Sequence, residues 1–107
     1  MDNRLKKRSD FDRVFKKGKR VYSKSLLLLY VKQKDLKIGY SVSKKNGGAV
    51  VRNKVKRLLR AVMREYVEGF KQSYHIVIVP KPSNEYSYHV FKEDVFYLLN
   101  KENLLND

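Results

Sequence analysis

Residues 44–64 read KKNGGAVVRNKVKRLLRAVMR and combine a helical apolar stripe with a dense run of positive charge. From about Ala49 to Phe70, apolar residues recur at spacings of three and four, which is the pattern of one buried helix face. Lys44 to Gly48 is basic and contains glycine, so we expect a loop that leads into a long helix over about 49–70. The apolar positions of that helix are Val51, Val55, Leu58, Leu59, Val62, Met63, Tyr66 and Phe70.

The opposite side of the same helix is basic. At roughly 100° per residue, the side chains that fall together there are those of Asn53, Lys56, Arg57, Arg60 and Arg64. No acidic residue lies between Arg52 and Arg64, whereas an ordinary solvated face interleaves Glu with Lys to form i, i+4 pairs. Like charges at this spacing cost a few tenths of a kcal/mol per pair, and a bound polyanion would offset that cost. We therefore expect this face to contact RNA or DNA.

The whole chain is strongly basic and is rich enough in apolar residues to fold. Its 107 residues include 25 Lys and Arg against 11 Asp and Glu, a formal net charge of +14. Such an excess attracts polyanions, of which a nucleic acid is the commonest and an anionic membrane surface the second. A hydrophobic content of 42% argues against a disordered basic tail. The absence of cysteine excludes disulfides and thiolate metal sites.

Nothing in the sequence indicates a membrane segment or a secretory signal. The longest apolar run, residues 26–31, is far too short to span a bilayer. The N-terminal stretch MDNRLKKRSDFD has no apolar core of the kind that a signal peptide needs. We expect a cytoplasmic protein without a membrane partner.

The remaining elements predict a single α+β domain over 1–107. A short helix is expected to begin at Ser9 as N-cap and to stop at Gly18. Strands are expected over 26–32 and 37–43, joined as an antiparallel hairpin by a turn at 34–35, with a weaker strand signal at 21–22. A buried central strand over 75–79 ends at Pro80, and a last helix over 88–101 has Ser87 as a candidate N-cap. The result is a small, mostly antiparallel sheet packed with three helices, an α/β sandwich with flexible ends over 1–8 and 102–107.

No set of residues forms a recognisable catalytic or metal site. His75 and His89 have no cysteine or carboxylate at ligand spacing, and Glu65 and Glu68 read as solvated partners of basic residues. Gly47 and Gly48 precede a helix, but no Gly-Lys-Ser/Thr follows, so the pattern is not a P-loop. We expect no catalytic residue and no metal ligand in this chain.

Aromatic residues are numerous for so small a core. Phe11, Phe15, Tyr22, Tyr30 and Tyr40 lie on or beside the predicted first helix and strands. Exposed rings could stack on unpaired bases, while buried rings would only pack the core. The sequence does not choose between these two roles for any single ring.

The segment SVSKKNGGAVVRNKVKRLLRAVMRE closely resembles the signature of the bacterial ribonuclease P protein component family. That family carries a Ser-x-Lys-Lys stretch, a small-residue turn, and a helix that opens Arg-Asn-Arg and continues Lys-Arg-Leu-x-Arg. RLKKRSDFDRVFKKGKR and HIVIVPKP also match, so the resemblance runs from Arg4 to about Leu99. The third residue of Arg-Asn-Arg is Lys54 here, which keeps the charge but lacks the planar guanidinium fork.

The resemblance implies the non-catalytic protein subunit of a ribonucleoprotein endonuclease that removes the 5′ leader from precursor tRNA. It places catalysis in the RNA subunit, with Mg²⁺ held mainly by that RNA and the substrate. We predict no protein partner. It also implies a fold like the second domain of ribosomal protein S5, with a left-handed βαβ crossover. The RNA-binding role then falls to Lys44, Lys45, Arg52, Asn53, Lys54, Lys56, Arg57, Arg60 and Arg64. A leader-binding cleft between the first helix and the sheet would be lined by Phe11, Phe15 and Tyr30.

Three other functions stay open at this point. A ribosomal or general RNA-binding protein without an enzymatic partner would share the charge and the basic helix. A stand-alone nuclease would cleave RNA with Mg²⁺ alone. A DNA-binding helix is less favoured, because neither a dimer seam nor helix-turn-helix spacing is visible.

Overall fold

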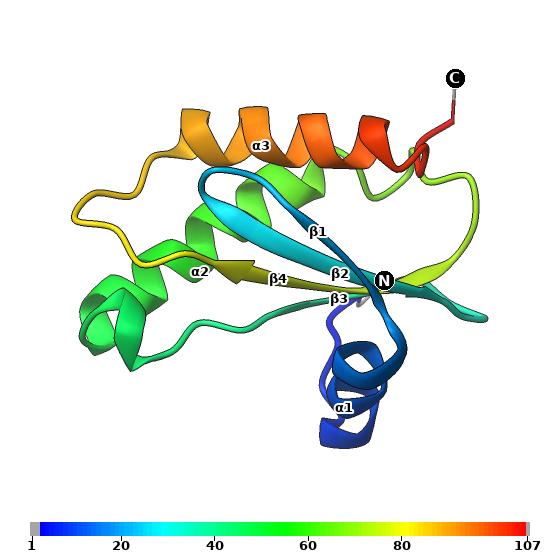
Figure 1. Cartoon of the computed structure of the whole chain (residues 1–107), viewed down its shortest axis with the longest axis horizontal. Helices are drawn as coiled ribbons and strands as arrows, with labels where there is room; N and C mark the ends of the chain where they lie inside the picture. Colours follow the sequence, from blue (N-terminus) through cyan, green and yellow to red (C-terminus); the bar gives the residue numbers. More distant parts are fainter. Residues whose placement is uncertain (1–2, 107) are drawn as a thin grey trace.

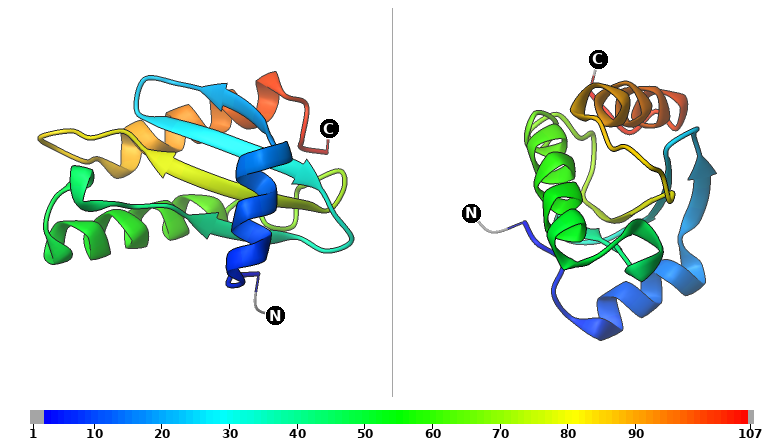
Figure 2. Two further views of the ribbon diagram at one scale, coloured as in Figure 1. Left: turned by 60° about the horizontal axis from the view of Figure 1, so that its bottom comes forward. Right: turned by 90° about the vertical axis from the view of Figure 1, so that its left-hand side faces the viewer.

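The computed structural model describes residues 3–106, which form three layers with a mixed sheet in the middle. Figure 2 shows one helix lying across one face of the sheet and two helices on the other side. The elements in chain order are α1 (Arg8–Lys17), β1 (Lys19–Tyr22), β2 (Leu26–Lys32), β3 (Lys37–Tyr40), the 3₁₀ turn η1 (Lys44–Asn46), α2 (Ala49–Arg64), β4 (Tyr74–Pro80) and α3 (Tyr88–Lys101).

The four strands lie in the order β1-β2-β4-β3 (Figure 1). The pairs β1/β2 and β2/β4 are antiparallel, and β3/β4 is parallel. The prediction of a mostly antiparallel sheet is therefore confirmed, as is the weakly signalled strand at 21–22. β3, α2 and β4 form a parallel crossover, and its left-handed sense stays a prediction.

The predicted hairpin between 26–32 and 37–43 is wrong. β4 lies between β2 and β3 and pairs with both, and the third strand ends at Tyr40. The reason is burial: β4 is apolar on both faces, and five consecutive residues from Tyr74 to Ile78 are buried. Such a strand is most stable in the sheet interior, where both of its edges are paired and both faces are covered.

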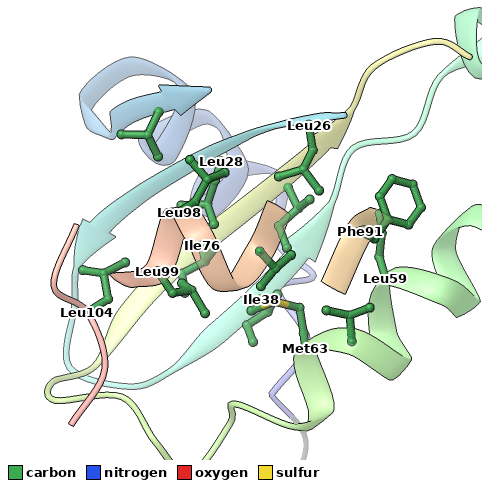
Figure 3. Packing of buried hydrophobic residues seen from close by; sticks show 14 of the residues in the cluster. Leu26, Leu28, Ile38, Leu59, Met63, Ile76, Phe91, Leu98, Leu99 and Leu104 are labelled. Atoms are coloured by element: carbon green, nitrogen blue, oxygen red, sulfur yellow. The ribbon is translucent and has the colours of Figure 1, made fainter. Parts of the chain in front are cut away.

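The larger core lies between the sheet and the helices α2 and α3. The side chains of this layer come from alternate positions of each strand, as the pleat requires. Figure 3 shows them interlocked: Leu26, Leu28, Ile38, Leu59, Met63, Ile76, Phe91, Leu98, Leu99 and Leu104, all buried.

A smaller core lies on the opposite face, under α1. Leu5, Val14, Leu29 and Val77 are buried there. Half-buried side chains surround this cluster; they are Phe11, Phe15, Leu27, Val31 and Val79. The short amphipathic helix predicted around Phe11 and Phe15 therefore docks on the sheet, as its two-to-three-turn length requires.

Helix ends differ from the prediction in two places. α1 begins at Arg8 with Lys7 as its N-cap, and no side chain caps it, so Ser9 lies in the first turn. α2 ends at Arg64 rather than Phe70, because Glu65 and Tyr66 make tighter i→i−3 bonds to the carbonyls of Val62 and Met63. The Ser87 cap is confirmed: its hydroxyl accepts from the Val90 amide, and α3 spans 88–101 as predicted.

The described ends of the chain pack against the rest of the fold, and the expected flexibility of 1–8 and 102–107 stays a prediction. The Leu5 amide donates to the Ile38 carbonyl at 3.0 Å, and the Leu5 side chain is buried against the sheet. Leu104 is buried, and residue 105 forms a bridge with Phe70. Local sequence did not reveal these non-local backbone pairs. Residues 1, 2 and 107 lie outside the described part.

Candidate nucleic-acid interface

The outer side of α2 carries the predicted basic face. Val55, Leu59, Val62 and Met63 are buried beneath it, which fixes the rotation of the helix about its axis. Most of the polar side chains directed away from that core are exposed: Asn53, Lys54, Arg57, Arg60 and Arg64. The other two, Arg52 and Lys56, are half-buried. The structure therefore brings all seven α2 residues of the prediction onto one helix, with Lys54 exposed beside the rest.

None of the basic side chains of this face forms an ion pair within residues 3–106. Glu65, the residue that directly follows α2, accepts from the Tyr88 hydroxyl at 2.9 Å and lies 3.5 Å from the Lys92 amine. The positive charge of α2 is thus left uncompensated, as the sequence pattern indicated.

The two lysines that precede α2 lie on η1, a turn held in place by hydrogen bonds of Asn46. Lys44 and Lys45 are exposed on η1, while Asn46 beside them is buried. The Asn46 amide group donates to the Pro80 carbonyl at 3.0 Å and to the Tyr86 hydroxyl at 3.2 Å. The side-chain oxygen of Asn46, Oδ1, accepts from the Ser43 backbone amide at 3.1 Å, which completes a capping box.

Asn46 is a positioning residue that the sequence reasoning missed. It ties the basic loop to the end of β4 and to the segment before α3, so Lys44 and Lys45 project from a fixed base. A usable signal was present, because Ser43 and Asn46 stand at the i, i+3 spacing of a capping box.

A trough of about 560 Å³ runs along α2 beside β3. Arg60 and Arg64 line one wall, Arg4 and the neighbouring N-terminal segment line the other, and Tyr40 lies between them. Burial raises the pKa of Tyr40 to about 12, although the charges of Arg60 and Arg64 act to lower it. Tyr40 therefore keeps its proton at neutral pH and remains a neutral neighbour of these cations.

A second hollow of about 230 Å³ continues the trough to α1. It shares Arg4, Tyr40 and Arg60 with the first and adds Lys56 and Phe11. The basic face of α2 and the aromatic side of α1, which the sequence predicted as separate sites, are therefore contiguous.

Gly39 allows Phe11 to lie against the sheet. A Cβ atom at residue 39 would lie 2.5 Å from the Phe11 ring and 3.1 Å from the Cβ of Leu5. Phe11 and Phe15 both pack, half-buried, on the small core of the α1 face. The structure thus brings these two predicted leader-cleft residues together.

The expectation that Tyr30 shares their cleft is wrong. Tyr30 belongs to the α2–α3 side of the sheet, where its ring packs edge-on against Tyr74 and its hydroxyl donates to Glu102 at 2.6 Å. Burial, followed by the Glu102 hydrogen bond, raises the pKa of Tyr30 well above its usual value. The error is one of strand parity, since Leu29 and Val31 are the β2 residues on the α1 face.

The two histidines of the chain lie on different elements, His75 on β4 and His89 on α3. His75 is buried and lies 3.0 Å from a carboxylate oxygen of Asp35, whereas His89 is exposed on α3. Within residues 3–106 no three His, Asp or Glu side chains converge as metal ligands. In the same range no helix has the length and apolar content needed to cross a membrane.

Fold and surface together define a small α+β protein whose longest helix presents uncompensated positive charge next to an aromatic cleft. Comparison with known proteins gives the family. The family model described as Ribonuclease P matches residues 1–103. The ribonuclease P protein component of Bacillus velezensis is 42% identical over 105 residues, covering 95% of this chain and 90% of the relative. That of Alkaliphilus oremlandii is 39% identical, covering 97% and 94%.

Solved structures agree with the sequence relatives. The RNase P protein of Staphylococcus aureus superposes with a TM-score of 0.86 at 26% identity, covering 99% of this chain and all of that one. The RNase P protein of Thermotoga maritima gives a TM-score of 0.79 at 28% identity, covering 92% and 96%. The chain belongs to the family of ribonuclease P protein components, subunits of a tRNA-processing ribonuclease.

Proposed function

We propose that this protein binds the catalytic RNA of ribonuclease P through η1 and α2, and the 5′ leader of precursor tRNA through the cleft beside α1. Cleavage is then carried out in the cytoplasm by the RNA subunit. The observation that carries the proposal is the continuous surface that joins the uncompensated charge of α2 to Phe11 through the trough. Family membership supports the subunit role over a general RNA-binding protein without an enzymatic partner.

The positive charge of the protein would reduce the repulsion between the two RNA molecules of the complex. The RNA subunit and precursor tRNA are both polyanions and repel each other. A subunit of net charge +14 placed between them screens this repulsion and releases counterions as its cations neutralise phosphates. Assembly should therefore require less Mg²⁺ in the presence of the protein.

The aromatic cleft adds discrimination. Leader contacts stabilise the complex with precursor tRNA, whereas mature tRNA has no leader to make them. Selectivity then arises as a difference between two affinities. Phe11 and Phe15 contribute half-buried ring surface on which unpaired bases can stack.

The lining of the trough does not fit a resident Mg²⁺ ion. Hard divalent cations need several oxygen ligands, whereas the trough wall is lined by Arg4, Arg60 and Arg64. Glu65 and Glu68 are the two carboxylates at its end. We therefore assign Mg²⁺ to the RNA and the substrate, and we derive no step of the protein through it.

The test is single-turnover cleavage of a 5′-labelled precursor tRNA at low Mg²⁺, with a bacterial ribonuclease P RNA alone, this protein alone, and both together. Cleavage at the mature 5′ end is expected only with both. Cleavage by the protein alone would instead establish a stand-alone nuclease. RNA binding without any stimulation of cleavage would support a general RNA-binding protein.

A matched pair of charge-removing variants tests the surface. Arg57→Ala removes one exposed cation from α2, and Lys34→Ala removes one exposed cation from the β2–β3 turn, outside both proposed surfaces. Arg57→Ala should raise the Mg²⁺ concentration needed for half-maximal cleavage, and Lys34→Ala should leave it near the wild-type value. Equal effects of the two variants would show that only net charge matters.

A further inference from the structure

The sheet face that receives α1 extends beyond the helix. The strand register aligns Tyr22 with Leu27 and Leu27 with Val79, so these three side chains form a row across β1, β2 and β4. The next row, through Leu29 and Val77, is fully buried under α1. Figure 2 shows α1 crossing the strands near one end, with no helix of the described chain over the remainder of this face.

The exposure of the open row increases toward the sheet edge. Leu27 and Val79 are half-buried around the same small core as Phe15, and Tyr22 is 57% exposed on the edge strand β1. From Val79 to Tyr22 the row spans two inter-strand spacings, about 10 Å. The row therefore continues the proposed leader cleft from Phe15 to a tyrosine at the rim.

Lys81 is fixed next to that tyrosine. Its amine lies over one face of the Tyr22 ring, 6.0 Å from the ring centroid, which leaves the other face for a base, and it donates to the Ser23 carbonyl at 2.5 Å. Its backbone amide donates to the Ser25 carbonyl at 2.8 Å. The turn between β1 and β2 is thereby tied to the residue that follows β4, which fixes the cation beside the ring.

The charge around the row favours a polyanion as the occupant. None of the four strands contains an acidic residue, and Lys24 lies exposed in the turn beside Tyr22. An exposed ring with a fixed ammonium group next to it presents a stacking surface and a phosphate partner together, which is the pattern of single-stranded nucleic-acid binding.

We propose that Tyr22 and Lys81 form a second stacking site for an unpaired base of the leader, farther from the cleavage site than the nucleotides at Phe11 and Phe15. The base stacks on the Tyr22 ring, Lys81 faces the adjoining phosphate, and Leu27 and Val79 support the intervening strand of RNA. This inference rests on the proposed function, because it extends the leader track that begins beside α1.

The experiment uses the holoenzyme reconstituted from ribonuclease P RNA and full-length protein. Precursor tRNAs carry leaders of increasing length, with 2-aminopurine at one leader position at a time, and both affinity and fluorescence quenching are measured. Tyr22→Phe keeps the ring, whereas Tyr22→Thr removes it and keeps a residue suited to an edge strand. Because Tyr22 is largely exposed, both variants should unfold at the wild-type midpoint.

The expected result depends on leader length. Tyr22→Thr should weaken binding of long-leader precursor about fivefold or more, the low end for one stacked base. It should also abolish quenching at one distal position. Short-leader precursor and mature tRNA should bind as they do to wild type, and Tyr22→Phe should behave as wild type throughout.

Failure of this inference and failure of the proposed function give different results. If Tyr22→Thr binds every leader length as wild type does while Phe15→Leu loses leader dependence, the Tyr22 site is refuted and the α1 cleft stands. If wild type itself binds precursor and mature tRNA equally, the leader-binding part of the proposed function fails, and the Tyr22 site fails with it. If Tyr22→Thr weakens mature tRNA equally, the residue contacts some other part of the RNA, which also overturns the proposal.

Discussion

Replacing Asn46 by alanine should destabilise the protein far more than replacing Asn53, although both asparagines lie within the same basic segment. Asn46 is buried, and its side chain makes three hydrogen bonds, to the Ser43 amide, the Pro80 carbonyl and the Tyr86 hydroxyl. Asn53 is exposed on α2. The comparison separates a buried residue that anchors η1 from an exposed residue of the proposed RNA-binding face.

The magnitude follows from the partners that the substitution leaves behind. The Pro80 carbonyl belongs to a buried residue, and an unsatisfied buried acceptor costs about 1–3 kcal/mol. Loss of the capping interaction with the Ser43 amide adds about 1 kcal/mol. The Tyr86 hydroxyl keeps other bonds, to the Asn46 carbonyl and the Ser83 amide, so it adds little. Asn46→Ala should therefore lower the free energy of unfolding by about 2–4 kcal/mol, and Asn53→Ala by less than about 0.5 kcal/mol.

The assay is denaturant unfolding followed by circular dichroism. It is run at one fixed ionic strength, because self-repulsion at a net charge of +14 makes the stability depend on salt. RNA affinity is measured in parallel under conditions in which both variants are folded. Equal unfolding midpoints for the two variants would refute the view that Asn46 anchors η1. A loss of stability without any change in RNA affinity would refute the view that this anchoring supports the proposed RNA contact of Lys44 and Lys45.

Three further predictions concern the charge, the cleft and the pH dependence. Arg60→Ala should flatten the dependence of log K on log salt by about 0.7–0.9 for one lost phosphate contact, measured by anisotropy with ribonuclease P RNA; an unchanged slope would show that Arg60 touches no phosphate. Phe15→Leu should reduce the preference for precursor over mature tRNA in competition binding. Tyr30→Phe should keep that preference and lower the unfolding free energy by about 1.5–3 kcal/mol, because it loses a hydrogen bond to a carboxylate. The opposite pattern would show that Tyr30, and not Phe15, contacts the leader. Hydrogen bonds from Lys19 and then Tyr30 lower the pKa of Glu102. The ionised carboxylate therefore stabilises the fold above the ordinary carboxyl pKa, and this stabilisation is lost as pH falls through the lowered pKa. Glu102→Gln should make the fall of the unfolding free energy with pH shallower below about pH 4.5, and an unchanged pH dependence in that range would argue against this linkage.

The sequence by itself determined the elements whose faces are strongly marked. The apolar stripe of α2 and the absence of carboxylates opposite it indicated both the buried side and the charged side of that helix. The β-branched run at 75–79, closed by Pro80, indicated a central strand, and Ser87 marked the start of α3. In each case neighbouring residues carry the information, since helix and strand periods are local properties.

Only the tertiary structure decided which elements lie next to one another. Pairing of β4 with both β2 and β3 is a non-local choice, and it separated two strands that a short turn had suggested as a hairpin. The same choice set the parity of β2, which placed Leu29 under α1 and Tyr30 on the other face. Burial of Asn46 and the trough between α2, β3 and the N-terminal segment likewise depend on residues far apart in the chain. Local periodicity shows which residues share a face, but the fold decides what that face meets, because strand pairing and helix docking are set by the burial of the whole core.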